Sequence, residues 1–263
     1  MTAPFGRRAA TVTAREAHGA YVVIRCNDPG GPEPRPGQFY MLAAAERWGG
    51  GEGERPFLPR AFSVLRARGR ELHFLIEDVG PGTKRLCELE PGEELRLVGP
   101  LGNGFSPPRE SREALLVGGG VGIAPLAIWQ DELGAGTPAL LGFRDAEHAA
   151  GAALLRAPVL ATDDGSVGHH GLVTDLLEEK LGEQVEVYAC GPPAMLEAVR
   201  AMCVERAVPA QLALESGMAC GFGACFGCVV PTVDGYVRLC LDGPVLDARV
   251  LRTAAPAGAG AGH

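Results

Sequence analysis

Short runs in which apolar and polar residues alternate dominate the chain up to about residue 108. This pattern is typical of β-strands that bury one face, and segments rich in Gly and Pro separate the runs. Many short strands at this spacing predict a small antiparallel barrel. The strands that we predict are Ala10–Ala14, Ala20–Cys26, Gln38–Ala43, Ala61–Arg66, Leu72–Asp78 and Glu94–Val98.

The pattern changes near residue 114, where apolar strand-like runs begin to alternate with segments of helical character. Strands that alternate with helices predict a doubly wound parallel sheet, which binds its ligands at the carboxyl ends of the strands. The predicted strands are Ala114–Val117, Thr137–Phe143, Val159–Thr162, Val185–Ala189 and Leu212–Leu214. The predicted helices are Pro125–Leu133, Leu172–Leu181 and Pro193–Arg206.

These patterns divide the chain into three folded parts and a tail. We expect an antiparallel barrel over residues 1–108, a doubly wound α/β domain over 109–215 and a small Cys-rich subdomain over 216–250. Residues 251–263 end in a run of mostly Ala and Gly, and we expect them to be disordered. The predicted fold class is therefore mixed β and α/β.

Composition narrows the classes of protein to which the chain can belong. Its 263 residues are 46% hydrophobic and 21% charged, as in ordinary globular proteins, and the net charge of −8 disfavours a nucleic-acid partner. The longest uncharged stretch, 114–130, contains a Gly triplet and a Pro, so we expect no membrane span. No apolar core follows the basic pair near the N-terminus, so we expect no signal peptide and a cytoplasmic location.

Four of the eight cysteines lie close together near the C-terminal end. Their spacing, C-x4-C-x2-C with a fourth Cys twelve positions later, is that of a plant-type ferredoxin 2Fe–2S cluster. Glycines between them permit a loop that wraps a cluster and points amide N–H groups at its sulfurs. A tetrahedral zinc site is the alternative, and unligated buried thiols are the third interpretation. The predicted metal ligands are Cys220, Cys225, Cys228 and Cys240.

Two turns in the α/β half directly follow predicted strands. The first is rich in glycine, which lets a pyrophosphate approach the backbone, and the next helix offers unpaired N–H groups and the positive end of its dipole. Tight turns need glycine in any case, so a structural role is the alternative. The second turn is equally compatible with a simple Pro-initiated helix. The residues are Gly118, Gly119, Gly120 and Gly122 in the first turn and Cys190, Gly191 and Pro192 in the second.

Two elements of the barrel have the chemistry to bind phosphate. Arg60 begins a predicted strand and can pair with a phosphate, and backbone N–H groups near Thr83 can hold a second one. Considered singly, each is better explained as a surface arginine and an ordinary turn. The sequence contains no Ser/His/Asp constellation and no H-E-x-x-H motif, so we predict no catalytic residues.

Taken in order, these motifs resemble the ferredoxin-reductase-like flavoproteins, in which an FAD-binding barrel precedes a nicotinamide-nucleotide domain. With the cysteine motif at the C-terminal end, the chain is similar to one branch, the electron-transfer subunits of type B dihydroorotate dehydrogenases. The resemblance extends over about residues 12–246. Ferredoxin–NADP reductases end in an aromatic residue that covers the flavin, whereas here the Cys-rich loop after Glu215 takes that place, which supports the cluster-bearing branch.

The resemblance implies roles for individual residues. One element of the family binds the FAD phosphate and places a hydroxyl near the isoalloxazine, a strand follows the flavin and ribityl chain, and a turn holds the FAD pyrophosphate. The residues that match the phosphate element are Arg60, Ala61, Phe62 and Ser63. Those that match the strand are Leu75, Ile76 and Glu77, and those that match the turn are Gly82 and Thr83. The Gly118–Pro125 turn matches the loop on the nicotinamide-nucleotide pyrophosphate, and the turn at Cys190 lies beside the nicotinamide in this family. Glu215 matches either an acidic residue near the flavin or a cap of the last strand.

The resemblance also implies which nucleotide is used. In NADP-using relatives a Ser-Arg pair after the third strand of the α/β domain holds the 2′-phosphate, whereas this chain has Asp163 and Asp164 there. Two carboxylates repel a phosphate, and one carboxylate can accept a hydrogen bond from a free ribose hydroxyl. We therefore predict a preference for NAD(H), with Asp163 at the ribose.

The three cofactors form a chemically sensible order. A nicotinamide carries two electrons as hydride, an iron–sulfur cluster accepts one at a time, and a flavin does both, so we expect FAD between the 2Fe–2S cluster and NAD(H). The branch implies a separate FMN-containing subunit that oxidises dihydroorotate to orotate in pyrimidine biosynthesis, in a heterotetramer with two copies of each chain. The alternatives are a similar subunit of a sulfide dehydrogenase, hydrogenase or transhydrogenase complex, and a zinc-stapled binding module without activity.

Overall fold

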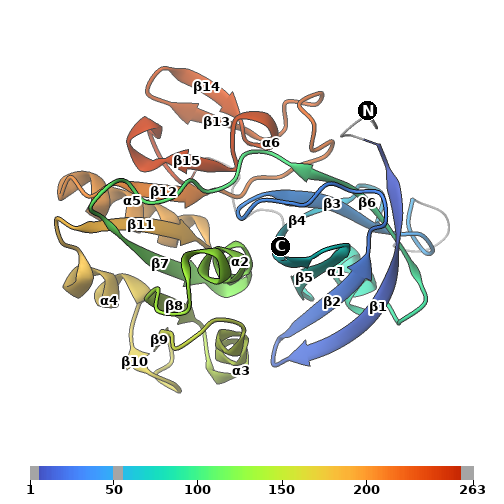
Figure 1. Ribbon diagram of the computed structural model, residues 1–263, viewed down its shortest axis with the longest axis horizontal. Coiled ribbons are helices and arrows are strands. Elements are labelled where there is room, and N and C mark those ends of the chain that lie inside the picture. Colours follow the sequence, from blue (N-terminus) through green and yellow to red (C-terminus); the bar gives the residue numbers. More distant parts are fainter. Residues whose placement is uncertain (1–5, 50–55, 256–263) are drawn as a thin grey trace.

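A closed antiparallel barrel forms the first part of the computed structural model, which describes residues 6–49 and 56–255 (Figure 1). Its strands are β1 (Arg8–His18), β2 (Tyr21–Asn27), β3 (Phe39–Ala44), β4 (Arg60–Arg68), β5 (Glu71–Glu77) and β6 (Glu94–Leu101). They pair in the order β1-β2-β5-β4-β3-β6 and close on themselves. All six predicted strands are present. The first is longer than predicted, because its polar second half pairs with β2 as far as His18.

A short helix, α1 (Pro81–Cys87), follows the barrel strand β5, where we expected a plain turn. Pro81 is tolerated in the first helical turn because its missing N–H needs no partner there. The buried side chains of Leu86 and Cys87 then join the core inside the barrel. Burial against the barrel, which a local pattern does not reveal, explains why a segment that begins Gly-Pro-Gly continues as a helix.

A seven-stranded sheet forms the second part, in the order β10-β9-β8-β7-β11-β12-β15. Its neighbours are parallel except for β15, which pairs antiparallel with β12. The strands are β7 (Glu113–Gly119), β8 (Ala139–Phe143), β9 (Val159–Thr162), β10 (His169–His170), β11 (Val185–Cys190), β12 (Ala210–Ala213) and β15 (Val245–Asp247). Strand β12 begins two residues before the predicted strand Leu212–Leu214 and ends one residue before it. Strands β10 and β15 were not predicted. The doubly wound sheet itself is confirmed.

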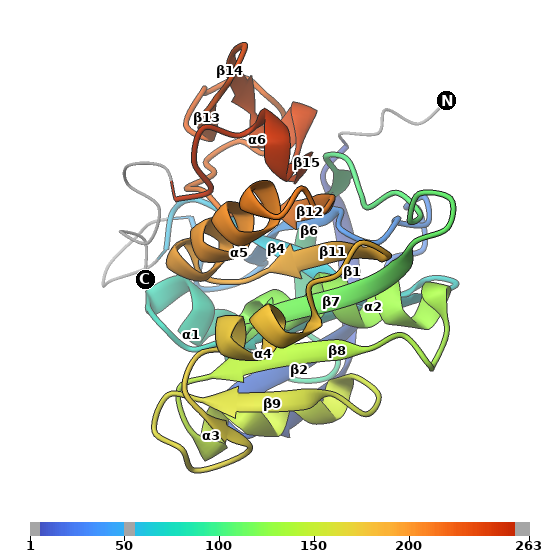
Figure 2. The ribbon, with the colours of Figure 1, turned by 90° about the vertical axis from the view of Figure 1, so that its left-hand side faces the viewer.

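Helices cover both faces of this sheet (Figures 1 and 2). They are α2 (Ile123–Leu133), α3 (Ala146–Ala149), α4 (Val173–Lys180) and α5 (Pro193–Glu205). Helix α2 lies against β4 of the barrel, whereas α4 and α5 lie on the opposite face of the sheet. None of the helices in the described part of the chain is both long and apolar enough to cross a lipid bilayer.

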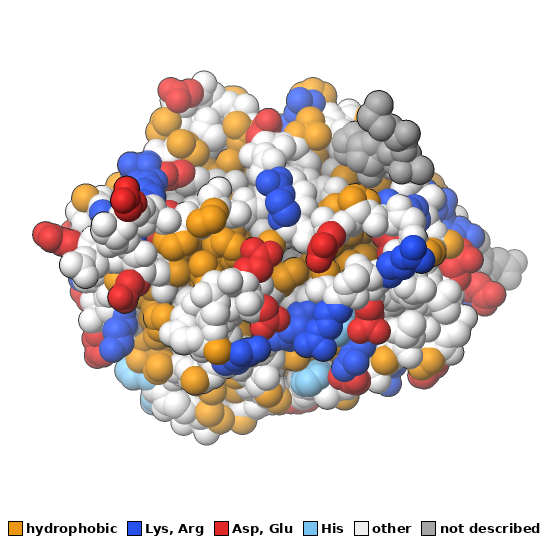
Figure 3. All heavy atoms as spheres, viewed as in Figure 1, with side chains coloured by type: hydrophobic (Ala, Val, Ile, Leu, Met, Phe, Trp, Pro, Cys, Tyr) orange, Lys and Arg blue, Asp and Glu red, His pale blue; other side chains and the backbone are white. Residues whose placement is uncertain are grey.

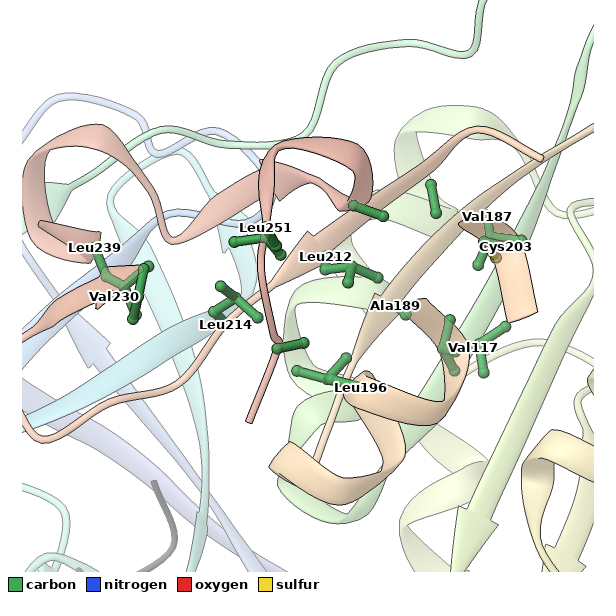
Figure 4. Packing of buried hydrophobic residues seen from close by; sticks show 14 of the residues in the cluster. Val117, Val187, Ala189, Leu196, Cys203, Leu212, Leu214, Val230, Leu239 and Leu251 are labelled. Carbon is green, nitrogen blue, oxygen red and sulfur yellow. The ribbon is translucent and has the colours of Figure 1, made fainter. Parts of the chain in front are cut away.

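The C-terminal part packs on the sheet and on the barrel together. It contains the hairpin β13 (Val229–Thr232) and β14 (Gly235–Arg238) and the helix α6 (Leu239–Asp242), none of which was predicted. Val230, Leu239 and Leu251 belong to the same buried cluster as Leu212 and Leu214 at the end of β12 (Figure 4). This part therefore has no separate core of its own.

The chain remains folded beyond residue 250, so the prediction of disorder from residue 251 was wrong for its first residues. Leu251 and Ala254 are each 2% exposed. Glu197 of α5 accepts hydrogen bonds from the Thr253 hydroxyl at 3.0 Å and from the Ala254 backbone N–H at 2.6 Å. Residues 256–263, the rest of the predicted tail, lie outside the described residues.

The Glu197 contacts predict a pH-dependent contribution to stability. The hydrogen bond from Arg200, with those from Ala254 and Thr253, lowers the pKa of Glu197 to about 2, although burial acts in the opposite direction. Because the folded pKa lies below the unfolded value, the carboxylate stabilises the fold above about pH 4.5, and this contribution is lost as the pH falls toward 2.

We expect Glu197→Ala to lower the free energy of unfolding by about 1 kcal/mol at neutral pH, and by clearly less at about pH 3. Urea denaturation at the two pH values measures the difference. The control is Glu178→Ala, which removes an exposed ion pair with Arg206 but no contact to the C-terminal segment. Equal losses for the two variants at both pH values would contradict the assigned role of Glu197.

Candidate functional site

The two predicted nucleotide turns lie side by side at the carboxyl ends of β7 and β11. Gly118 and Cys190 occupy paired positions on these strands. A Cβ on Gly122 would lie 2.5 Å from the Cys190 carbonyl oxygen and 2.5 Å from the Gly191 nitrogen, so only glycine permits this approach. The strand order reverses between β7 and β11, and such a switch point is where open α/β sheets bind their ligands.

The backbone of the first turn is open where a phosphate would approach. Gly120 has φ +53°, and a Cβ on it would meet no atom within 4 Å. By contrast, a Cβ on Gly119 would lie 2.9 Å from Cδ of Pro192, so Gly119 faces the neighbouring turn. Residues 120–122 form a short 3-10 turn before α2, which begins at Ile123, two residues earlier than predicted.

Cys190 presents a neutral thiol where the two turns meet. Burial raises its pKa, and the negative charge of Glu215 raises it further. Glu215 therefore lies close enough to the second turn to act on it electrostatically. A thiol of this kind supplies a small, uncharged group beside the predicted nicotinamide position and is not a nucleophile.

Asp163, the predicted ribose contact, is exposed just after β9. Its backbone N–H donates to the Phe143 carbonyl at 3.0 Å, and the Asp164 N–H donates to the Arg144 carbonyl at 3.2 Å, so the loop is fastened to the end of β8. Only β8 separates β9 from β7, which places this loop roughly 10 Å from the glycine turn. A dinucleotide can span that distance. Sequence reasoning missed Arg144, although its place directly after a predicted strand was a usable signal.

The two predicted phosphate-binding elements of the barrel also meet. A Cβ on Gly82 would lie 2.8 Å from Nε of Arg60, so the guanidinium lies flat against the first turn of α1. Arg60 Nη1 donates to the Leu58 carbonyl at 2.7 Å. The Thr83 hydroxyl accepts from the Val79 N–H at 2.9 Å and donates to the Gly80 carbonyl at 3.0 Å, so it fixes the turn that precedes the helix.

The predicted flavin strands separate where the cofactor would lie. Pairing of β4 with β5 runs from Arg68 and Glu71 to Val64 and Phe74, and it includes neither Arg60–Ser63 nor Leu75–Glu77. Leu75 and Ile76 are each 1% exposed, and their side chains belong to two different core clusters. These two residues can therefore offer only backbone groups to a cofactor, whereas Ala61 is exposed and Phe62, Ser63 and Glu77 are half-buried.

The four clustered cysteines lie in two pairs. The Cys228 and Cys240 sulfurs are 3.3 Å apart and buried. Cys225, which is exposed, lies close enough to Cys220 for its thiol to lower the pKa of Cys220. Burial raises the pKa of Cys220, but the N–H groups of Phe222, Cys225 and Ala224 together with the Cys225 thiol outweigh it and lower the pKa to about 7.

This arrangement fits a binuclear cluster. Each iron of a 2Fe–2S cluster takes two of four cysteine ligands, which matches two pairs of thiols and a loop with N–H groups directed at sulfur. A mononuclear zinc site needs its four ligands around one point, whereas the spacing of these cysteines is that of a plant-type ferredoxin.

The cysteine loop rests directly on the barrel wall that contains the predicted flavin element. Gly221 has φ +79°, and a Cβ on it would lie 2.5 Å from Cγ of Met41 and 3.0 Å from Cδ1 of Leu101. Met41 on β3 is paired with Ala61 on β4. One strand therefore separates the loop after Cys220 from the strand that begins the predicted FAD site.

Comparison with known proteins gives a consistent family. Residues 215–252 match the family model described as the iron-sulfur cluster binding domain of dihydroorotate dehydrogenase B. The chain is 37% identical over 216 residues to the dihydroorotate dehydrogenase B (NAD(+)) electron transfer subunit of Clostridium acetobutylicum, covering 81% of this chain and 84% of the relative. It is 39% identical over 224 residues to that of Caldanaerobacter subterraneus, covering 82% and 86%.

Solved structures share the architecture. A chain of an NADH-dependent reduced ferredoxin-NADP oxidoreductase superposes with a TM-score of 0.76 at 26% identity, covering 93% of this chain and 90% of that one. The ferredoxin reductase of carbazole 1,9a-dioxygenase gives a TM-score of 0.67 at 24% identity, covering 79% and 68%. The second likeness supports the fold alone.

The paired cysteines predict a spectroscopic loss. We expect Cys228→Ser to abolish the electron paramagnetic resonance signal of a reduced 2Fe–2S cluster while bound flavin is retained, because the barrel elements do not include this residue. Cys203→Ala is the control, since Cys203 is buried in α5 and not in the loop. A full cluster signal in Cys228→Ser, with iron content unchanged, would refute the ligand assignment.

Proposed function

This chain belongs to the family of dihydroorotate dehydrogenase B electron-transfer subunits, and we propose that it transfers electrons between an FMN-containing partner subunit and NAD⁺. The partner oxidises dihydroorotate to orotate in pyrimidine biosynthesis, and the electrons pass through a 2Fe–2S cluster and FAD held by this chain. One observation carries the proposal: the cysteine loop and the predicted flavin element lie on neighbouring strands of one barrel wall.

The residues of the chain act by binding and positioning. Bound FAD exchanges a hydride with a nicotinamide and single electrons with a cluster. Arg60 and the first turn of α1 hold the FAD phosphates, and the diverging edges of β4 and β5 receive the flavin. The glycine turn after β7 holds the nucleotide pyrophosphate, and Cys190 lies at the nicotinamide. Hydride transfer needs no acid or base from the protein, so the residues fix geometry and exclude water.

The same proposal covers the organisation of the chain. FAD is assigned to residues 1–108, NAD(H) to 109–215 and the cluster to 216–250, with ligands Cys220, Cys225, Cys228 and Cys240. We place the protein in the cytoplasm, in a heterotetramer of two copies of this chain and two of the FMN subunit. The 37–39% identity to subunits that carry this name supports the partner.

A second candidate function is that of an electron-transfer subunit in a ferredoxin-NADP oxidoreductase complex. The structural likeness that covers 93% of the chain favours it. The match of the cysteine domain to the dihydroorotate dehydrogenase B family model favours the first candidate. The partner that co-purifies with the chain decides between them: an FMN enzyme that oxidises dihydroorotate, or a different flavoprotein.

We expect the isolated, cofactor-loaded chain to reduce a dye such as ferricyanide with NADH and to leave dihydroorotate unoxidised. The chain has sites for both nucleotide cofactors, whereas the oxidation of dihydroorotate belongs to the partner. Absorbance assays with each donor measure the two activities, and addition of the FMN subunit restores the second. Dihydroorotate oxidation by the isolated chain would contradict the proposed division of labour.

We expect kcat/KM for NADH to exceed that for NADPH by about tenfold or more, because Asp163 and Asp164 repel a 2′-phosphate. Asp163→Asn should lower this ratio, mainly through KM. Asp234→Asn, in the turn between β13 and β14 and remote from the predicted nucleotide site, serves as the control. Equal efficiencies for the two nucleotides in the natural chain would overturn the assignment.

A further inference from the structure

Arg144 joins the seven-stranded sheet to the barrel through a compact group of side chains. Its Nη2 donates to Oε1 of Glu77, at the end of β5, over 2.5 Å. The same nitrogen lies 2.5 Å from Nε2 of His148. On the other side of the imidazole ring, Nδ1 of His148 lies 2.7 Å from Oδ1 of Asp145.

His148 occupies a fixed position beside Arg144. Its Nδ1 lies 2.7 Å from Oδ1 of Asp145, and its Nε2 lies 3.3 Å from Oε1 of Glu77. The imidazole ring meets Tyr21 edge-on with centroids 5.7 Å apart. Glu77 is the only negatively charged group that pairs with Arg144 among the described residues.

Arg144 is only loosely held by these contacts. Its side chain is 65% exposed, compared with 18% for Glu77. An ion pair with one partner this exposed contributes little to stability, so exchanging the partner costs little. Charged side chains of both signs are mixed with histidine in the lower part of the face in Figure 3, below the level of the central apolar side chains.

The backbone position of Arg144 points to a ligand. It directly follows β8, whose Gly142 pairs with Gly119 of the glycine turn. Its carbonyl accepts from the N–H of Asp164, beside the predicted ribose contact Asp163. Arg144 thus places a cation between the predicted pyrophosphate turn and the predicted ribose loop, at the edge of the sheet where nucleotides bind.

We propose that Arg144 exchanges Glu77 for the adenosine-side phosphate of NAD(H) and so positions the nucleotide across the sheet. A guanidinium can give two parallel hydrogen bonds to a phosphate, which competes well with the single short contact to Glu77. His148 and Glu77 keep the side chain at this edge of the sheet before the nucleotide arrives. The inference rests on the proposed nucleotide site and adds a residue that the sequence did not single out.

Calorimetric titration of the FAD- and cluster-loaded chain with ADP-ribose tests this role. ADP-ribose has the pyrophosphate but no nicotinamide, so its binding does not depend on electron transfer. We expect Arg144→Gln to weaken ADP-ribose binding by about 10-fold or more, and Arg144→Lys to restore only part of the affinity, because an ammonium keeps the charge but not the two parallel hydrogen bonds. The matched control is Arg156→Gln, since Arg156 is 61% exposed and its nearest carboxylate, of Asp131, is 3.8 Å away.

Adenosine monophosphates identify the phosphate involved. We expect Arg144→Gln to weaken binding of adenosine 5′-monophosphate and to leave the affinity for adenosine 2′-monophosphate unchanged, while the flavin content of the variant stays that of the natural chain. Unchanged affinity of Arg144→Gln for ADP-ribose would overturn the proposal, and so would a loss confined to the 2′-monophosphate. Arg144-dependent binding of ADP-ribose by a chain that fails to reduce dyes would refute the proposed function and leave this inference standing.

Discussion

The contact between the cysteine loop and the barrel wall determines what this molecule can do. The rate of single-electron transfer falls steeply with distance, so a cluster is useful only if it is held close to the flavin. Gly221 brings the loop against Met41 and Leu101, and the positive φ there and the absence of a Cβ make that approach possible. Met41 is paired with the strand that begins the predicted FAD site. The shared core of the C-terminal part and the sheet keeps the loop in this position.

Close backbone approach is used again at the predicted nucleotide site. The two turns after β7 and β11 meet because Gly122 has no side chain, which turns a strand-order reversal into a narrow binding edge. At the barrel, Gly82 lets the Arg60 guanidinium lie against α1. Glycine thus serves the same purpose at all three predicted cofactor positions: it allows two segments distant in sequence to touch while their backbone groups stay available.

Local sequence patterns were enough to predict the elements whose residues alternate or repeat within one segment. The six barrel strands and the α/β alternation are of this kind, as is the cysteine spacing, where the ligands themselves form the signal. The helix at Pro81 and the strand at Val245 could not be predicted, because their few residues are ordered by burial against distant parts of the chain. The same holds for Leu251 and Ala254, which a compositional bias toward Ala and Gly assigned to a tail. The Glu77, Arg144 and His148 cluster joins two parts of the fold, so no sequence window contains it.

The central claim is that one polypeptide holds a flavin and an iron–sulfur cluster in electronic contact. Rapid mixing of the anaerobic, cofactor-loaded chain with NADH, followed by freezing and electron paramagnetic resonance, tests it most directly. The account predicts that the flavin absorbance bleaches and that the signal of a reduced 2Fe–2S cluster then grows without any partner protein. Flavin bleaching with a cluster that stays oxidised, although dithionite reduces it, would contradict the account.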